Sequence, residues 1–402
     1  GGNVYFTVAG QNDYDVATTV QSGATVSIVT NGFGTTSLLT IDDGGSVILS
    51  ENETQTVGGL DGSGGLTISN GATFTLDQDG DAEIDNVLGG SGTFAVDLGA
   101  STNALSFTNT ASTFAGTLQV TNALLDYDNT SAMESVMGGV GVNLGNGGVY
   151  HLNENRIAGL TLNGGRLVAH STTVSGADDY QLFVSGNLNV DSEASSEITA
   201  GGVVLGSTSD IFTANSSAGI KQVFVEYGGS GSVTLDGDGY VQGITLSGLD
   251  GQSNITNTGS DVVVAHGTWT AGGVQHDETE KQLYANLQLV QIELIDESGN
   301  GLILDTTDLS SQNELSARLT GSGNLTLAGN MIIGTGDSET TDWNDYTGRT
   351  QISGGVISLA ETNALGATSV LQVTGGQVNL SNQSVQVGSL DLDVADALTG
   401  DG

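Results

Sequence analysis

The residues of this chain best able to do chemistry are its carboxylates, because 46 Asp and Glu stand against 6 Lys and Arg. Glycoside hydrolysis needs two facing carboxylates. The candidate pairs are Asp42-Asp43, Asp178-Asp179 and Asp391 with Asp393. Each pair falls in a polar corner or alternates outward on an expected strand, so we interpret these acids as solvated. A lyase acting on acidic sugars would also need clustered cations, whereas the six cations here are scattered.

A serine protease is the second enzyme class to consider, since it needs a Ser activated by His and oriented by Asp. No Gly-x-Ser-x-Gly nucleophile elbow stands out beside the four histidines, which are His151, His170, His266 and His276. The lack of Cys removes thiol catalysis and Cys-ligated metal clusters. We predict that the protein is not an enzyme and uses no cofactor. A β-helical polysaccharide-degrading enzyme is kept as the less favoured alternative.

Two short acidic segments offer the oxygen ligands that Ca²⁺ accepts. The first, Asp77 to Asp81, resembles the start of an EF-hand loop, but it is followed by Ala82 and Leu88 where that loop needs Gly and Glu. The second is Asp236-Gly237-Asp238-Gly239. Asp-Gly sequences are also ordinary turn chemistry, and we predict no metal site.

The net charge of −40 excludes several kinds of partner. A nucleic-acid binder needs a basic footprint, and adsorption to an anionic membrane needs basic residues as well. No run of 18 apolar residues is present, so no segment is expected to cross a bilayer as a helix.

Apolar residues alternate with small polar ones along most of the chain, as in Thr73-Phe74-Thr75-Leu76 and Val233-Thr234-Leu235. This period of two predicts short, half-buried strands. A motif of the form Leu-x-Gly-Ser-Gly before such a strand begins at Leu60, Leu88 and Leu319, and a variant begins at Tyr227. Short strands bury their apolar faces when successive coils of the chain stack on one another.

The sequence therefore predicts an all-β fold, a parallel β-helix (β-solenoid) with loops projecting from its corners. At roughly 20–25 residues per coil it would have about 16–20 coils, and residues 1–402 would form a single domain. The 63 Gly suit corners that need positive φ, and we expect Gly323 and Gly355 to be such corners. The lack of Pro suits strands whose N–H groups are all needed. Trp269 is expected in the core or on a sheet face.

The segment from Tyr346 to Leu359, with Asn363-Ala364-Leu365-Gly366 and Val370 to Val373 after it, resembles the passenger-associated strand repeat of bacterial autotransporters, the type V secretion family. As in that family, it follows a Gly-Ser-Gly-x-Leu-Thr-Leu strand, here Gly321 to Leu327. A degenerate copy lies at Phe114 to Val120.

The resemblance implies a right-handed β-helical passenger domain, exported to the Gram-negative cell surface and in many members acting as an adhesin. Passengers of this family meet the outer membrane through a C-terminal β-barrel, which we do not expect within these 402 residues. The explicit repeat covers only about 60 residues, and its motif does not identify a ligand.

The longest breaks in the repeat lie at Asp210 to Lys221 and at His276 to Gly301, and functional residues tend to lie on loops held by a rigid scaffold. The two lysines of the chain fall beside these breaks. Our candidate ligand-binding residues are Asp210, Lys221, Asp236, Asp238, Asp277 and Lys281. The competing interpretation of a lone Lys among acids is an ordinary ion pair worth about 0–1 kcal/mol. Trp343, in an acidic segment, is a further candidate contact.

The function that we expect is adhesion to host matrix proteins or glycans through a polar face of the rod, by many weak contacts that add up to avidity. The alternative is binding to the same protein on neighbouring cells, as in aggregation and biofilm formation.

Overall fold

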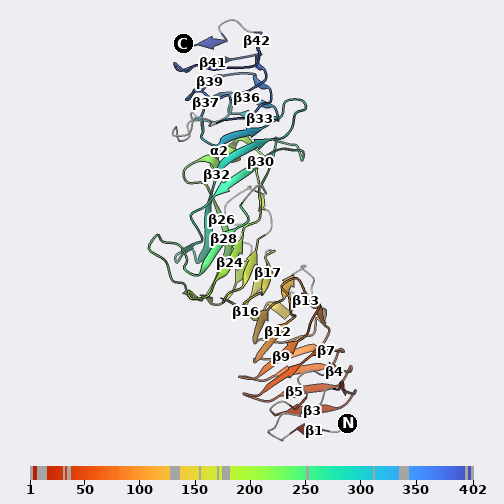
Figure 1. Ribbon diagram of the computed structural model, residues 1–402. Coiled ribbons are helices and arrows are strands. Elements are labelled where there is room, and N and C mark those ends of the chain that lie inside the picture. The colour runs from red at the N-terminus through yellow and green to blue at the C-terminus, as the bar shows by residue number, and fades with distance from the viewer. Residues whose placement is uncertain are drawn as a thin grey trace.

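The structure is a computed structural model, and it describes residues 3–6, 16–29, 32–33, 38–126, 136–153, 155–169, 172–173, 182–249, 253–310, 313–334, 344–393 and 397–399. It forms an elongated rod with β1 at one end and β42 at the other (Figure 1). About 49% of the chain is strand, and parallel coils stack into a β-solenoid of about 15 turns. The predicted all-β parallel solenoid is confirmed.

In the N-terminal part of the rod, strands of successive coils pair in parallel and form its faces (Figure 1). The first sheet contains β1 (Asn3–Phe6), β3 (Thr25–Ile28), β5 (Ser46–Leu49), β8 (Gly65–Ile68) and β11 (Val87–Gly90). A shorter sheet contains β2 (Thr18–Val20), β4 (Leu38–Ile41) and β7 (Gly59–Asp61).

Two longer sheets continue toward the middle of the rod. The eight-stranded one contains β6 (Thr54–Val57), β9 (Thr73–Asp77), β12 (Thr93–Asp97), β14 (Thr117–Thr121), β16 (Gly141–Leu144), β19 (Gly159–Leu162), β23 (Leu188–Val190) and β27 (Gly231–Ser232). The seven-stranded one contains β10 (Ala82–Ile84), β13 (Ala104–Phe107), β15 (Leu124–Asp126), β17 (Val149–His151), β20 (Arg166–Val168), β24 (Ser196–Thr199) and β28 (Ile244–Ser247). A parallel pair joins β21 (Thr172–Thr173) to β25 (Val203–Val204).

The C-terminal part has two five-stranded parallel sheets. One contains β33 (Leu302–Asp305), β36 (Leu325–Ala328), β38 (Thr350–Ile352), β40 (Leu371–Val373) and β42 (Leu390–Leu392). The other contains β34 (Asn313–Leu315), β37 (Asn330–Ile333), β39 (Val356–Leu359), β41 (Gln377–Asn379) and β43 (Leu398–Thr399).

The core is a continuous column of inward-facing apolar side chains. In β9 and β12, buried and half-buried residues alternate, because successive side chains of a strand point to opposite faces. The register stacks like on like, so that Phe74 pairs with Phe94, with ring centroids 6.0 Å apart, and Phe94 pairs with Leu118. Burying such a side chain contributes roughly 1.5–3 kcal/mol. Each coil has too few residues to bury its apolar side chains by itself, and the neighbouring coils cover them.

Coil length varies although the register is kept. Val142 pairs with Leu160, 18 residues further on, whereas Leu188 pairs with Gly231, 43 residues further on. The longer of these coils contains a helix, α2 (Thr208–Asn215), and an eight-residue strand, β26 (Ile220–Tyr227).

Three copies of the Leu-x-Gly-Ser-Gly motif form the same corner. In each copy, the first glycine of Gly-Ser-Gly has a φ near +90°. A Cβ on this glycine would lie 2.0–2.3 Å from a carbonyl oxygen of the preceding coil. The three glycines are Gly62, Gly90 and Gly321. The N–H of the second glycine donates a hydrogen bond to that same carbonyl, from Gly64, Gly92 and Gly323. Only glycine fits this corner, which explains why the motif is repeated.

The prediction of a positive φ is confirmed for Gly355 and is wrong for Gly323. Gly355 has a φ of +75°. Gly323 is not in the positive-φ region, and what requires glycine there is crowding, since a Cβ would lie 2.6 Å from the backbone nitrogen of Ile295.

Antiparallel strands interrupt the parallel order between residues 205 and 300, although β27 and β28 in this range still pair in parallel with β23 and β24. This region contains helix α2 (Thr208–Asn215) and the strands β26 (Ile220–Tyr227), β29 (Ser253–Thr256), β30 (Val263–Thr270), β31 (Gln275–Asp277) and β32 (Gln282–Leu294). The 13-residue β32 pairs antiparallel with β26, β30 and β31, and then in parallel with β35 (Arg318–Gly321), where the coil order resumes. β26 in turn joins two short parallel strands, β22 (Leu182–Val184) and β18 (Asn155–Ile157).

Both predicted breaks fall in this region. The first contains α2, whose N-terminus is capped by Ser207, with its side-chain oxygen accepting the Asp210 N–H. The second contains β32, so the apolar stretch from Leu283 to Ile295 is mostly an antiparallel strand. Trp269 is buried, as expected, and its indole N–H donates to the Ser253 hydroxyl.

We predict that Gly355→Ala destabilises the C-terminal coils and that Gly354→Ala does not. The left-handed backbone costs a non-glycine residue about 1–2 kcal/mol, and the new Cβ of the first variant would lie 1.9 Å from the Gly329 carbonyl oxygen. No atom lies within 4 Å of a Cβ built on Gly354, the adjacent control position. Hydrogen exchange of the β37 and β39 amides measures the difference, and equal protection in both variants would contradict the corner assignment.

Candidate functional site

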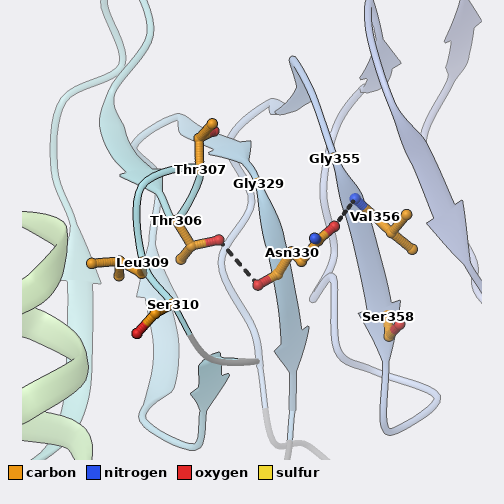
Figure 2. A pocket seen from close by; sticks show the side chains of 9 residues that line it. All are labelled: Thr306, Thr307, Leu309, Ser310, Gly329, Asn330, Gly355, Val356 and Ser358. Atoms are coloured by element: carbon orange, nitrogen blue, oxygen red, sulfur yellow. Dashed lines mark hydrogen bonds between the residues drawn. The ribbon is translucent and has the colours of Figure 1, made fainter.

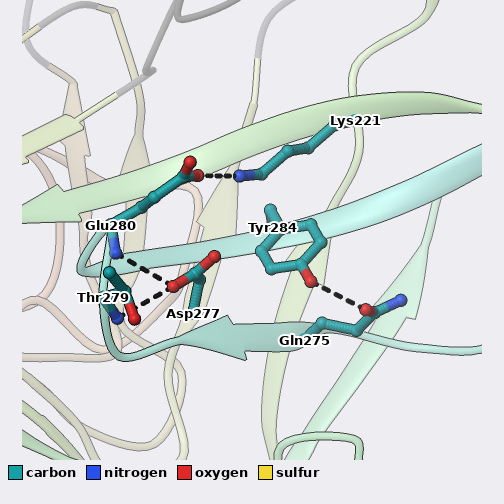
Figure 3. Close-up of polar contacts among 6 residues, drawn as sticks. All are labelled: Lys221, Gln275, Asp277, Thr279, Glu280 and Tyr284. Carbon is teal, nitrogen blue, oxygen red and sulfur yellow. Dashed lines mark hydrogen bonds and ion pairs between the residues drawn. The ribbon is translucent and has the colours of Figure 1, made fainter.

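The antiparallel strands bring together a group of polar side chains at the hairpin between β31 and β32 (Figure 3). The turn is built by Asp277, whose carboxylate accepts the N–H groups of Thr279 and Glu280 at 2.8 and 2.9 Å. Such local bonds are why Asp favours turns. Lys281 completes the turn with a φ of +57°. The sequence Asp277 to Lys281 thus folds into a tight turn that projects charged side chains from the end of β32.

Lys221 reaches the turn from the neighbouring strand β26. Its ammonium pairs with the Glu280 carboxylate and lies 4.6 Å from the centre of the Tyr284 ring, a cation–π distance (Figure 3). The Tyr284 hydroxyl donates to the side-chain oxygen of Gln275 at 2.9 Å. These contacts hold three strands in fixed relation at the surface.

Lys281 is fixed in a different way. Its ammonium donates to the carbonyl oxygens of Gly228 and Gly229, both at 2.9 Å. These glycines belong to the fourth motif copy, which begins at Tyr227. The hairpin is therefore clamped to the corner where this copy departs from the other three.

Tyr227 and His276 form the inner layer of the site. The phenol oxygen lies 2.7 Å from His276 Nε2, and the two rings stack with centroids 5.9 Å apart. Burial lowers the pKa of His276, and the carboxylates of Glu278 and Asp277 oppose this. Burial also raises the pKa of Tyr227. The pKa of Asp277 is lowered, first by the N–H of Glu280 and also by Thr279 and Lys221. The directions of these pKa shifts favour a neutral Tyr227–His276 pair beside an ionised Asp277 carboxylate.

We name this group the hairpin cluster: Lys221, Tyr227, Gln275, His276, Asp277, Glu280, Lys281 and Tyr284. It offers both charge signs, aromatic rings and amide groups on one rigid surface. Polar and charged groups of these kinds orient a ligand in a binding site.

The predicted site residues lie in three places in the fold. The structure brings Lys221, Asp277 and Lys281 together in the hairpin cluster. Asp236 and Asp238 lie in a nearby turn, in which Asp236 accepts the N–H groups of Asp238 and Tyr240, both at 2.9 Å. Asp210 lies in the first turn of α2, outside the cluster.

The cluster also contains residues that sequence reasoning missed, chiefly Tyr227, His276 and Tyr284. One signal was available, because Tyr227 stands where the other motif copies have Leu. Its contact with His276, 49 residues away, is a tertiary contact that no motif reveals.

Two of the acids considered for catalysis or metal binding accept hydrogen bonds from neighbouring coils. Asp81 accepts the Ala104 N–H at 2.8 Å, and Asp391 accepts from the Gln372 amide at 3.1 Å. No group of three or more His, Asp or Glu placed to hold a metal ion occurs among the described residues. Asp178, Asp179, His170 and Trp343 lie outside them.

In the part of the chain that the structure describes, no helix is long and apolar enough to cross a membrane.

Comparison with known proteins does not assign a function to this chain. No protein-family model and no solved structure matches the chain. The chain is similar to the uncharacterized protein YuaQ of Escherichia coli strain K12, with 28% identity over 348 residues. The aligned region covers 81% of this chain but 24% of that protein, so the chain spans about a quarter of its relative's length.

We predict that the hairpin loosens as the pH falls from about 8 to about 5. The pKa of His276 in the folded protein is lowered below its ordinary value of ~6.5, so the unfolded segment binds a proton first. Stability from this group is therefore complete above the ordinary pKa and is lost as the pH falls through the folded pKa.

The measurement is the protection of the β31 amides against hydrogen exchange, corrected for the intrinsic effect of pH. His276→Gln should flatten the dependence, and His151→Gln, in β17, should leave it unchanged. An unaltered pH dependence in His276→Gln would show that other groups cause it.

Proposed function

We propose that the protein is a bacterial cell-surface adhesin, the passenger domain of an autotransporter, and that the hairpin cluster is part of its contact surface. The observation that carries the proposal is that one interruption of the coil order places Lys221 of β26 beside the β31–β32 hairpin that holds Lys281, so that both lysines of a chain of net charge −40 lie in the hairpin cluster. A scaffold of stacked coils holds this hairpin rigidly, as binding loops require.

The family part of the proposal rests on the passenger-associated repeat. Its residues occupy successive coils of the C-terminal sheets, where Tyr346 is fully buried and its hydroxyl lies 2.6 Å from that of Thr350. The similarity to a protein of Escherichia coli agrees with a bacterial origin. A chain without Cys and Pro also avoids disulfide and prolyl-isomerisation steps if it folds after export.

The charges of the cluster indicate how adhesion would work. The net charge repels polyanions at long range, although salt screens this beyond about 8–10 Å. Near the hairpin, Lys221 and Lys281 offer cations beside the Asp277 and Glu280 carboxylates. A matrix protein or glycan with mixed polar groups fits this surface, and many rods on one cell would multiply weak contacts.

The test compares two triple variants that divide the six predicted residues. Lys221→Gln, Asp277→Asn and Lys281→Gln together should weaken adhesion of displaying cells to immobilised matrix components at least about tenfold, or ~1.4 kcal/mol. The control triple, Asp210→Asn, Asp236→Asn and Asp238→Asn, should stay near wild type. Circular dichroism checks that both rods fold. Normal adhesion by the first triple would exclude the hairpin cluster as the contact surface.

Self-association between cells is the second candidate, and a specific observation favours it. The outward positions of the eight-stranded sheet, from β6 to β27, carry mostly Thr, Asn, Gln and Gly, with acids only at Asp77 and Asp97. Register stacks these residues, as in the Thr73–Thr93–Thr117 row. Two rods could therefore bind each other through this nearly uncharged face with little electrostatic repulsion.

Self-association predicts that acids on this face block cell aggregation. Gln119→Glu with Asn189→Glu should abolish it, whereas Gln351→Glu with Gln372→Glu, which adds the same charge on the C-terminal coils, should not. Sedimentation of displaying cells is the measurement. Equal aggregation by both double variants would rule out this face.

A further inference from the structure

A hollow of about 540 Å³ lies where three consecutive C-terminal coils turn from one sheet to the next (Figure 2). The segment after β33, from Thr306 to Ser310, forms one side of it. Gly329 and Asn330 contribute from the next coil, and Gly355, Val356 and Ser358 from the one after. Pockets for small ligands are typically about 300–1,000 Å³, so the hollow has room for a sugar unit.

Two of the residues that line the hollow, Gly329 and Gly355, lie at corners that cannot carry side chains. Gly329 and Gly355 have φ values of +81° and +75°. A Cβ on Gly329 would lie 2.4 Å from the Thr306 hydroxyl oxygen, and one on Gly355 would lie 1.9 Å from the Gly329 carbonyl oxygen. The floor is therefore backbone, fixed by the stacking itself.

The wall of the hollow is also fixed in place. The Thr306 hydroxyl donates to the Asn330 carbonyl oxygen at 3.0 Å (Figure 2), and the Asp305 carboxylate accepts the Thr307 N–H at 2.9 Å. Helix α2 supports the segment from outside, because the Asp305 N–H donates to the Thr208 hydroxyl at 3.0 Å. A site whose shape exists before binding loses less entropy when a ligand arrives.

The lining is uncharged, although the protein carries a net charge of −40. The Asn330 side-chain oxygen accepts the Val356 N–H at 3.0 Å (Figure 2), which leaves its NH₂ group facing no acceptor among the described residues. The hydroxyls of Thr307, Ser310 and Ser358 likewise make no hydrogen bond to the parts of the chain described. Leu309 and Val356 add small apolar surfaces, and Val356 is 37% exposed.

We propose that this hollow binds a neutral sugar unit of a glycan. Hydroxyls and an amide both donate and accept hydrogen bonds, as sugar hydroxyls require, and the apolar side chains suit the C–H surface of the ring. A sulfated or carboxylated sugar would meet no cation among the lining residues and would be repelled by the acidic rod. The hollow adds a ligand class to the proposed adhesin function, but it is separate from the hairpin cluster, so the two can fail independently.

The experiment presents the purified full chain to an array of neutral oligosaccharides of galactose, N-acetylglucosamine, fucose and mannose, with sulfated and sialylated versions of each. Neutral members should bind, and charged versions should bind at least about tenfold more weakly. Binding to charged versions alone, or to none, would overturn the proposal.

Three variants locate the binding. Val356→Trp fills the hollow from an exposed position and should abolish binding of the best neutral oligosaccharide. Asn330→Asp keeps the acceptor for the Val356 N–H, removes the NH₂ donor and should weaken binding at least about tenfold. Gln377→Trp is the matched control, because Gln377 pairs in register with Val356 one coil further on and does not line the hollow. Undiminished binding by the first two variants would overturn the assignment.

The hairpin triple variant separates this proposal from the proposed function. It should bind the oligosaccharide like the wild type, even where it abolishes adhesion of cells to matrix. Loss of oligosaccharide binding in that variant, with the rod still folded, would place the sugar site at the hairpin and overturn the assignment to the hollow.

Discussion

The structure depends on backbone hydrogen bonds between one coil and the next, with the register kept. A strand of three to five residues buries its inward side chains only because the strands before and after it cover them. The register places Phe74 on Phe94 and Leu118 on Val142, and the same stacking forces glycine at corners such as Gly90 and Gly321. The sheets, the core and the corners thus all follow from stacking the coils in register. Only the outward-facing polar residues are free of this constraint.

The fold could be predicted because its signals are local. Alternation of apolar and polar residues marks strands, and the repeated Gly-Ser-Gly corner marks their stacking. The antiparallel region could not be predicted, because an apolar run such as Leu283 to Ile295 is equally compatible with either strand direction. Gly323 illustrates another limit: sequence indicates that glycine is needed, but not whether a positive φ or a close backbone contact is the cause.

The candidate site was predictable only in part, for a related reason. Lys221, Asp277 and Lys281 were conspicuous as charges beside breaks in the repeat, and strand pairing does bring them together. Their partners were not conspicuous. Tyr227 and His276 belong to strands that both pair with β32, so their contact depends on an arrangement that no spacing rule contains. Asp210 was equally conspicuous as a charge, yet it lies in the first turn of α2.

Because coil length varies, the length of the rod and the size of its corner loops can change independently. A coil of 18 residues and one of 43 add the same single step to the stack, since only their paired strands must match. The length of the rod is therefore decided by the number of coils, and the breadth of its surface at each level is decided by the residues inserted at a corner. Evolution can lengthen such a rod by duplicating coils and diversify it by enlarging corners, and neither change disturbs the other.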